Sequence, residues 1–193
     1  MRVGVLALQG SFKDHLKMLD RLDVDATLVR LPRDLDKVNG LIIPGGESTT
    51  IGRLIVRYGL DKVIKFRCNR GMPIYGTCAG AILLAREIVN SRQPRLALMD
   101  ISVKRNDYGR QIDSFEVDLD ISDGKPFRGI FIRAPTIISV GKRCKVLSRF
   151  QDKPVLVEQE NLLASTFHPE LVGDTRIHKY FIEMVKKNNK IVV

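Results

Sequence analysis

The chain has 193 residues, of which 44% are hydrophobic and 28% are charged, and its formal net charge is +10. This length suits a single domain spanning residues 1–193, which can bury about 70% of its unfolded surface without a disulfide or metal. The composition excludes collagen, coiled coils and long disordered proteins. No apolar run reaches the roughly 20 residues that a membrane-spanning helix needs.

The basic residues are spread along the chain, tryptophan is absent and aromatic residues make up only 6%. No stacking surface or finger motif is visible, so we do not expect a nucleic-acid or membrane partner. The short apolar run at the N-terminus ends at Gln9 and is typical of a first strand rather than a signal peptide. Cys68, Cys78 and Cys144 have no metal-type spacing. We therefore expect a cytoplasmic protein without metal or cofactor, in which one thiol could be functional.

Strands and helices alternate along the first half of the chain. The expected strands are 3–8, 26–31, 40–43 and 73–75, and the expected helices are 12–22, 49–58, 60–69 and 79–89. Ser11 could cap the first helix, with Leu16, Leu19 and Leu22 on its inner face. Apolar strands joined by helices predict a mostly parallel central sheet in a three-layer α/β sandwich.

The second half is predicted to add antiparallel strands at one side of the sheet. The expected strands are 96–105, 112–119, 129–132, 155–159 and 162–167, with turns at 107–109 and 123–124 and a closing helix at 174–187. Functional sites of such sheets form where the strands end. The three motifs described next follow predicted strands.

The first motif is a cysteine between two glycines, in the sequence GTCAG at residues 76–80. Between a strand and a helix, such a cysteine sits on a tight turn that pushes its side chain out of the sheet. Glycines on both sides keep the turn free of β-carbons, and the following helix begins near the sulfur and favours the thiolate. A buried small cysteine in a glycine-rich turn is the alternative, but the flanking strand and helix favour a nucleophile.

The second motif is His168-Pro169-Glu170, directly after the last predicted strand. Residues two apart in an extended segment face the same way, so Glu170 can bond one imidazole nitrogen while the other faces Cys78. This predicts a nucleophile, a base and an orienting acid. His15 and His178 lack such a partner, and we expect them at the surface or satisfied in the core.

The third motif is PGGEST at residues 44–49, which ends a strand and opens a helix. It lacks the P-loop pattern, and a plain turn with a Ser or Thr cap is the simplest structure for it. Next to a cysteine nucleophile, however, glycine amides predict an oxyanion hole, with the amide of Ala79 as the second donor.

Together these motifs resemble the class I glutamine amidotransferases and, more narrowly, the glutaminase subunits of pyridoxal 5'-phosphate synthase. The matching segments are LALQG at 6–10, PGGESTT at 44–50, GTCAG at 76–80, FIRAP at 131–135 and FHPEL at 167–171. They span nearly the whole chain in the expected order. The resemblance implies a flavodoxin-like class I amidotransferase fold with additional antiparallel strands.

The resemblance also implies a role for each matching residue. Cys78 would attack the glutamine carboxamide, His168 would transfer the proton and Glu170 would orient His168. The glutamine-binding positions would be Gly46, Glu47, Ser48, Arg105, Ile132 and Arg133, with Gly46 and Ala79 at the oxyanion hole. From composition alone, the two arginines would be ordinary surface charges.

In the family, ammonia passes through a channel to a separate synthase subunit, and the resemblance implies that partner here. Gln9 and Gly10 would be the contact and switch point, although a plain strand-to-helix turn would look the same. Alternatives are a glutaminase of another pathway, such as histidine biosynthesis, a cysteine peptidase or chaperone-like protein with a similar turn, and a basic binding module. The segments at 46–50 and 131–135 favour the glutaminase subunits of pyridoxal 5'-phosphate synthase over these alternatives.

Overall fold

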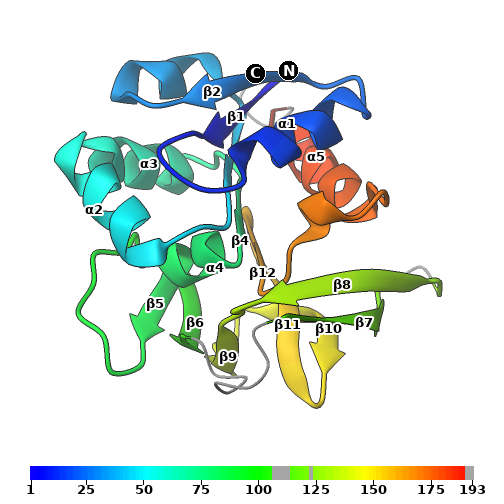
Figure 1. The fold of residues 1–193 in the computed structure, drawn as a ribbon. Helices are drawn as coiled ribbons and strands as arrows, with labels where there is room; N and C mark the ends of the chain where they lie inside the picture. Colours follow the sequence, from blue (N-terminus) through cyan, green and yellow to red (C-terminus); the bar gives the residue numbers. More distant parts are fainter. Residues whose placement is uncertain (106–113, 122–123, 190–193) are drawn as a thin grey trace.

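The computed structural model describes residues 1–105, 114–121 and 124–189 (Figure 1). A seven-stranded sheet forms its centre. The strands lie side by side in the order β10 (Lys145–Phe150), β11 (Lys153–Gln159), β12 (Leu162–Ser165), β4 (Ile74–Thr77), β3 (Gly40–Ile43), β1 (Arg2–Leu6) and β2 (Asp25–Val29). The last five are parallel, and β10 and β11 add an antiparallel edge. In chain order the parallel part is 2-1-3-4-5, the flavodoxin-like arrangement, which confirms the predicted fold class.

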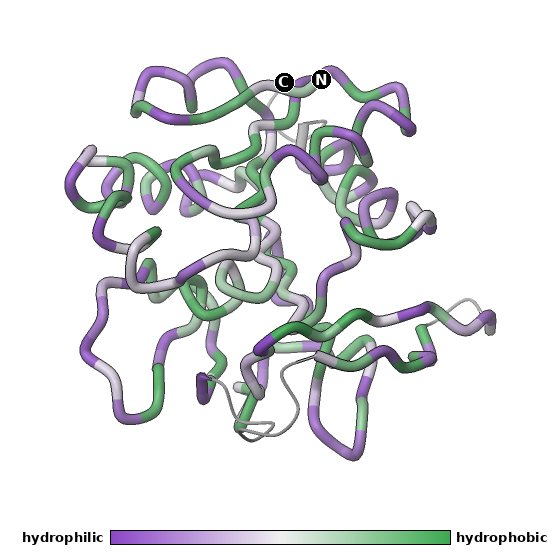
Figure 2. Tube along the Cα trace, in the orientation of Figure 1, coloured by the Kyte–Doolittle hydropathy of each residue, from purple (hydrophilic) through white to green (hydrophobic). Residues whose placement is uncertain are grey.

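Helices cover both faces of this sheet. One layer contains α2 (Ser48–Arg57), α3 (Leu60–Asn69) and α4 (Ala79–Leu84), and the other contains α1 (Phe12–Asp20) and α5 (Arg176–Asn189), as Figure 1 shows. Alternate residues of β3 separate the two cores, since Leu41 and Ile43 pack into one and Ile42 packs into the other. Figure 2 shows hydrophobic residues along the central strands, as expected for a sheet buried on both faces.

Two smaller sheets lie beyond the central one (Figure 1). One contains β5 (Ala85–Ile88), β6 (Met99–Lys104) and β9 (Thr136–Val140), and the other is the hairpin of β7 (Ser114–Asp120) and β8 (Pro126–Ile132). Two 3-10 helices, η1 (Pro32–Lys37) and η2 (Pro169–Leu171), complete the regular structure of the described residues. The hairpin confirms the additional antiparallel strands.

The predicted helix at 79–89 is wrong in its second half. The helix ends at Leu84, and Ala85–Ile88 forms β5, which pairs in parallel with β6. Alanine, arginine and glutamate favour helices, but pairing with β6 outweighs that local preference. In α1, Leu19 is buried as expected, whereas the neighbouring Leu16 is only half-buried and His15 is fully buried.

Two strands of the structure, β9 and β10, were not predicted from the sequence. The β10–β11 turn consists of Gln151 and Asp152, both with positive φ (47° and 62°). Such two-residue turns normally contain Asn-Gly or Asp-Gly, so this one has no sequence signal. The predicted turns at 107–109 and at residue 123 lie outside the described residues.

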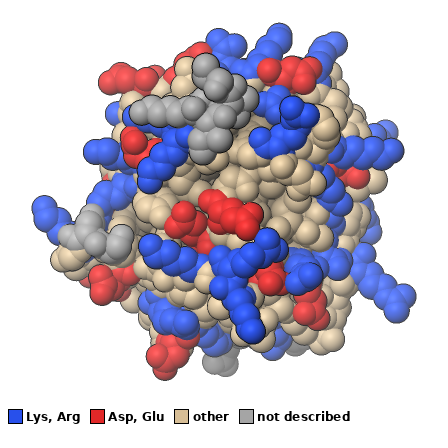
Figure 3. All heavy atoms as spheres, turned by 180° about the vertical axis from the view of Figure 1, so that it is seen from behind, with Lys and Arg blue, Asp and Glu red and all other residues tan. Residues whose placement is uncertain are grey.

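The charges form no continuous basic band on the face in Figure 3, where acidic side chains lie among the Lys and Arg residues. None of the described helices is long and apolar enough to cross a membrane.

Candidate active site

Four strand ends meet at one edge of the central sheet. The segments that follow β1, β3, β4 and β12 contain Gly10, Gly45, Cys78 and His168, respectively. They line one pocket of about 440 Å³, together with residues from the loops that follow β6 and β8. Because parallel strands end at the same edge, motifs far apart in the sequence meet here, as predicted.

Cys78 lies on a strained turn between β4 and α4. Its φ of 48° is unusual for a residue with a side chain, and its amide donates to the carbonyl of Ser165 at 2.8 Å. A β-carbon at Gly80 would lie 2.1 Å from the carbonyl oxygen of Ile43, so the turn requires glycine there. Strain of this kind is typical of functional positions. The Cys78 thiol is 3.8 Å from the carbonyl oxygen of Ile132.

His168 lies between Cys78 and Glu170. Its Nδ1 is 2.7 Å from Oε1 of Glu170, and its ring lines the same pocket as Cys78, where both residues lie beside Gly45. Burial alone would lower the pKa of His168, but Cys78 and Glu170 raise it to about 10. Burial alone would raise the pKa of Glu170, but His15, His168 and the Ser11 hydroxyl lower it to about 2. The predicted contact between His168 and Glu170 is present, and it favours an imidazolium beside a carboxylate.

The local geometry of the base differs from the prediction. Pro169–Leu171 forms the 3-10 helix η2 rather than an extended segment. The tight turn brings Glu170 back to His168, so the predicted bond forms for a different reason. The amide of His168 donates to the carbonyl of Ile130 at 2.8 Å, which ties this turn to β8.

The glycine loop packs directly against the base. A β-carbon at Gly45 would lie 2.4 Å from Cε1 of His168, and its carbonyl accepts the amide of Ser11 at 3.0 Å. Gly10 (φ 103°) leaves no room for a side chain either, because a β-carbon there would lie 1.9 Å from the oxygen of Gly45. Gln9 Oε1 accepts the amide of Glu47 at 2.8 Å. The segments after β1 and β3 therefore form one close-packed wall of the pocket.

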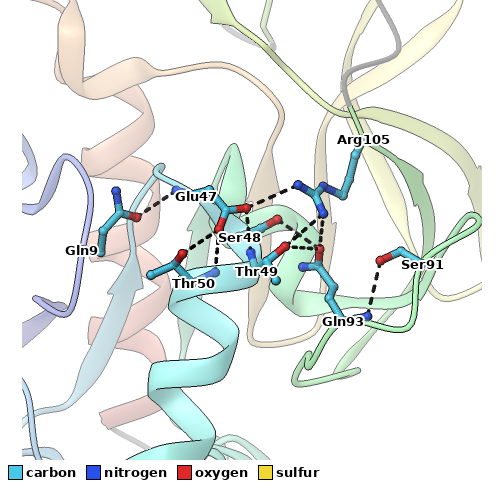
Figure 4. Close-up of polar contacts among 8 residues, drawn as sticks. All are labelled: Gln9, Glu47, Ser48, Thr49, Thr50, Ser91, Gln93 and Arg105. Atoms are coloured by element: carbon cyan, nitrogen blue, oxygen red, sulfur yellow. Dashed lines mark hydrogen bonds and ion pairs between the residues drawn. The ribbon is translucent and has the colours of Figure 1, made fainter.

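Glu47, rather than a Ser or Thr, caps α2 (Figure 4). Its carboxylate accepts the amides of Thr49 and Thr50 at 3.0 and 2.7 Å. Partial burial would raise the pKa of Glu47, but hydrogen bonds from these two threonines lower it to about 2. The oxygen that accepts from Thr49, Oε1, also lies 3.3 Å from the guanidinium of Arg105, so Glu47 is charged at the mouth of the pocket.

A buried glutamine, Gln93, organises this side of the pocket (Figure 4). Its Oε1 accepts from Arg105 at 2.7 Å, from Thr49 at 3.2 Å and from Ser48 at 3.3 Å. Sequence reasoning missed Gln93, because it lies in a segment without regular structure whose only signal was an adjacent proline. It holds the guanidinium of Arg105 toward the pocket.

The other predicted site residues lie around the same space. Gly46, Glu47, Ser48, Arg105, Ile132 and Arg133 all line the pocket. Arg133 has a φ of 44°, a second strained position at the rim. Ala79 follows Cys78 as the first residue of α4. The structure thus brings together all the predicted residues, although their roles stay predictions.

Ser11 is not the side-chain cap that was predicted. It precedes α1, but its hydroxyl donates to Oε1 of Glu170 at 2.7 Å instead. His15 and His178 are fully buried in the core, one of the two expected locations, although Nδ1 of His178 has no partner among the described residues. His15 lies 3.5 Å from Oε2 of Glu170, and His178 contacts His15. No sequence signal links them, since 163 positions separate the two histidines.

Comparison with known proteins gives the family. The profile of the SNO glutamine amidotransferase family matches residues 5–187. The chain belongs to the SNO glutamine amidotransferase family. Two similar relatives are both named pyridoxal 5'-phosphate synthase subunit PdxT. The one from Carboxydothermus hydrogenoformans is 52% identical over 97% of this chain and 99% of its own length. The one from Pelotomaculum thermopropionicum is 54% identical over 95% of this chain and 94% of its own.

Solved structures agree with this family assignment. A crystal structure described as a glutamine amidotransferase has a TM-score of 0.92 and 49% identity, and the match covers 95% of this chain and 98% of that one. The PurLQS structure from Thermotoga maritima has a TM-score of 0.70 at 17% identity, covering 97% of this chain and 96% of that one. The second likeness concerns the fold alone.

Proposed function

We propose that the protein hydrolyses L-glutamine to L-glutamate and ammonia, with Cys78 as nucleophile, His168 as base and Glu170 as orienting acid. The observation that carries this proposal is the geometry of the strained Cys78 turn, which places the thiol in the same pocket as a His168 ring held at 2.7 Å by Glu170. Cys78 and His168 line one pocket, and the family is a glutamine amidotransferase family.

The chemistry follows from the positions of these groups. The sulfur attacks the carboxamide carbon, and His168 takes the thiol proton and transfers it to the departing ammonia. A thioester to Cys78 remains, and water activated by His168 then releases glutamate and restores the thiol. The backbone amides of Gly46 and Ala79 are assigned to the oxyanion, where losing one donor typically costs about 100–1000-fold in rate.

Glutamine would lie across the pocket with its amino-acid end toward Glu47 and Arg105. Both are charged and near each other at the mouth, so they suit an ammonium and a carboxylate group, respectively. Gly46, Ser48, Ile132 and Arg133 would complete the binding site around the side chain. Gln93 supports this assignment because it holds Arg105 and Ser48 together.

The ammonia would pass to a synthase subunit that makes pyridoxal 5'-phosphate, in a hetero-oligomeric complex. The names of the relatives support this partner over a glutaminase of another pathway. Gln9 and Gly10 are the proposed contact and switch point, since they pack on the glycine loop beside His168. Three free cysteines agree with a cytoplasmic location.

The test mixes the protein with its synthase subunit and follows glutamate release and pyridoxal 5'-phosphate formation. Cys78→Ala or Cys78→Ser should abolish glutamate release and leave synthase binding intact. Cys144→Ser is the matched control, because this thiol lies outside the pocket and should not matter. Full activity in Cys78→Ala would refute the nucleophile. Glutamate release without pyridoxal 5'-phosphate formation would refute the partner alone.

A further inference from the structure

Two histidines behind the triad have no role in the mechanism above. His15 on α1 and His178 on α5 are both fully buried, and Nδ1 of His15 lies 2.9 Å from Nε2 of His178. The other nitrogen of His15, Nε2, is 3.2 Å from the Thr77 hydroxyl and 3.5 Å from Oε2 of Glu170. The histidine pair therefore extends from the side of Glu170 that faces away from His168.

The environment of Glu170 is uneven. Its side chain is fully buried, and Oε1 accepts from both His168 and Ser11 at 2.7 Å. Among the described residues, Oε2 of Glu170 has no hydrogen-bond partner. Nε2 of His15 lies within ion-pair distance of this oxygen, at 3.5 Å. A buried carboxylate is stable only when nearby polar groups compensate its charge. What His15 presents to Oε2 therefore matters for the triad.

The proton positions of the pair follow from its surroundings. Burial lowers the pKa of His15, and it lowers the pKa of His178 to about 3, so both rings are neutral at neutral pH with one N–H each. If His15 donated to His178, the His178 proton would lie on Nδ1, which has no partner among the described residues. His15 would also turn a lone pair toward a carboxylate. Both consequences are unfavourable.

The opposite arrangement avoids both problems. When Nε2–H of His178 donates to Nδ1 of His15, the His15 proton lies on Nε2. That N–H then donates to Thr77 and points its positive end toward Glu170. Within the part of the chain that the structure describes, the unpartnered atom left in the pair is then an acceptor, Nδ1 of His178, which costs less than a buried orphan N–H.

We propose that His178 and His15 are positioning residues for the triad, in which His178 fixes the tautomer of His15 and His15 stabilises the ionised Glu170. The chain of contacts runs from α5 through α1 to the base, in the order His178, His15, Glu170, His168 and Cys78. This inference rests on the proposed glutaminase triad. It adds two residues outside the GTCAG, HPE and PGGEST motifs.

Loss of the histidine pair should slow the reaction and change its pH dependence. A polar contact with a buried charge is worth about one power of ten in an equilibrium. Without it, the ionised Glu170 can turn away from His168, so the imidazolium of His168 loses its partner and the thiolate forms at higher pH. We expect about a tenfold lower kcat and an acid limb of the rate profile moved up by about one pH unit. KM should not change, because neither histidine lines the pocket.

The experiment compares three substitutions of His178 in the complex with the synthase subunit. His178→Gln places an amide N–H where Nε2 was and should keep kcat within about threefold. His178→Asn places its amide nearer the position of Nδ1, and His178→Leu has no donor, so both should show the loss. Phe181→Leu is the packing control, since it lies on the same helix and contacts Tyr75 rather than the triad.

Alkylation of Cys78 by iodoacetamide gives a second readout in the same variants, with Cys78→Ala subtracted as background. The inference is overturned if His178→Leu and His178→Asn keep the wild-type kcat and the wild-type pH dependence of alkylation. It is also overturned if kcat falls as much in His178→Gln as in His178→Asn. Both side chains carry an amide, and they differ in where its N–H lies, so an equal loss would show that the position of the donor does not matter. If Cys78→Ala stays active, the proposed function fails instead.

Discussion

Replacing Gly45 with alanine should damage the base without removing any catalytic group. A β-carbon at this position would lie 2.4 Å from Cε1 and 3.0 Å from Nδ1 of His168, and 3.4 Å from Cβ of Cys78. Ordinary contacts of a β-carbon begin at 3.4 Å, so the imidazole must move by about 1 Å. The backbone of Gly45 cannot retreat freely, because its carbonyl accepts the amide of Ser11.

A displacement of this size has a large expected effect on the reaction. Misplacing a reacting group by about 1 Å costs on the order of 100-fold in rate. Overpacking of a buried site costs about 1–3 kcal/mol in stability, which a domain of this size survives. We therefore expect Gly45→Ala to fold, to bind glutamine within a few-fold of wild type and to lose about 100-fold in kcat.

Steady-state glutamate release in the presence of the synthase subunit would measure kcat and KM, and thermal unfolding would confirm the fold. Gly173→Ala is the matched control, because nothing lies within 4 Å of a β-carbon there. A folded Gly45→Ala variant with kcat within twofold of wild type would show that the reaction tolerates a displaced His168 imidazole. That result would refute the expectation that the exact position of His168 limits the rate.

Three other outcomes follow from the contacts. Gln93→Leu removes the shortest bond to Arg105, so KM for glutamine should rise about tenfold while kcat changes less than threefold in steady-state assays; the reverse pattern would contradict a binding role. Arg67→Ala removes two 2.7 Å bonds to carbonyls of the η1 region and should lower the free energy of unfolding in urea by about 2–3 kcal/mol; a loss below about 0.5 kcal/mol would contradict this. The pH dependence of stability should have two limbs. The pKa of Glu170 is lowered from 4.5 to about 2, so its contribution is complete above pH 4.5 and disappears as the pH falls toward 2. The pKa of His168 is raised from 6.5 to about 10, so its contribution is complete below pH 6.5 and disappears as the pH rises toward 10. The buried His15 and His178 have lowered pKa values, so the protein also loses stability through them as the pH falls below 6.5. Urea unfolding across this range should show the highest stability near pH 6.5, and Glu170→Ala should flatten the part of the acid limb below pH 4.5; an unchanged limb there would exclude Glu170 as a contributor.

The sequence alone determined the layered α/β fold and the residues that meet in the pocket. Apolar strands separated by helices are expected to form a parallel sheet, because the helices can then cover both faces of the sheet. Strands of such a sheet end at one edge, so Cys78, His168 and the glycine loop had to meet there. These inferences succeeded because each depends on a local pattern followed by a general rule of topology.

The tertiary structure decided which contacts those residues make. Local preference indicated a helix through residue 89, but pairing with β6 made Ala85–Ile88 a strand. Ser11 could have capped a helix, yet a carboxylate 159 positions away accepts its hydroxyl. Gln93, His15 and His178 lie outside the GTCAG, HPE and PGGEST motifs. Their partners are distant in sequence, and only the packing of helices and loops against the sheet brings buried donors to buried acceptors.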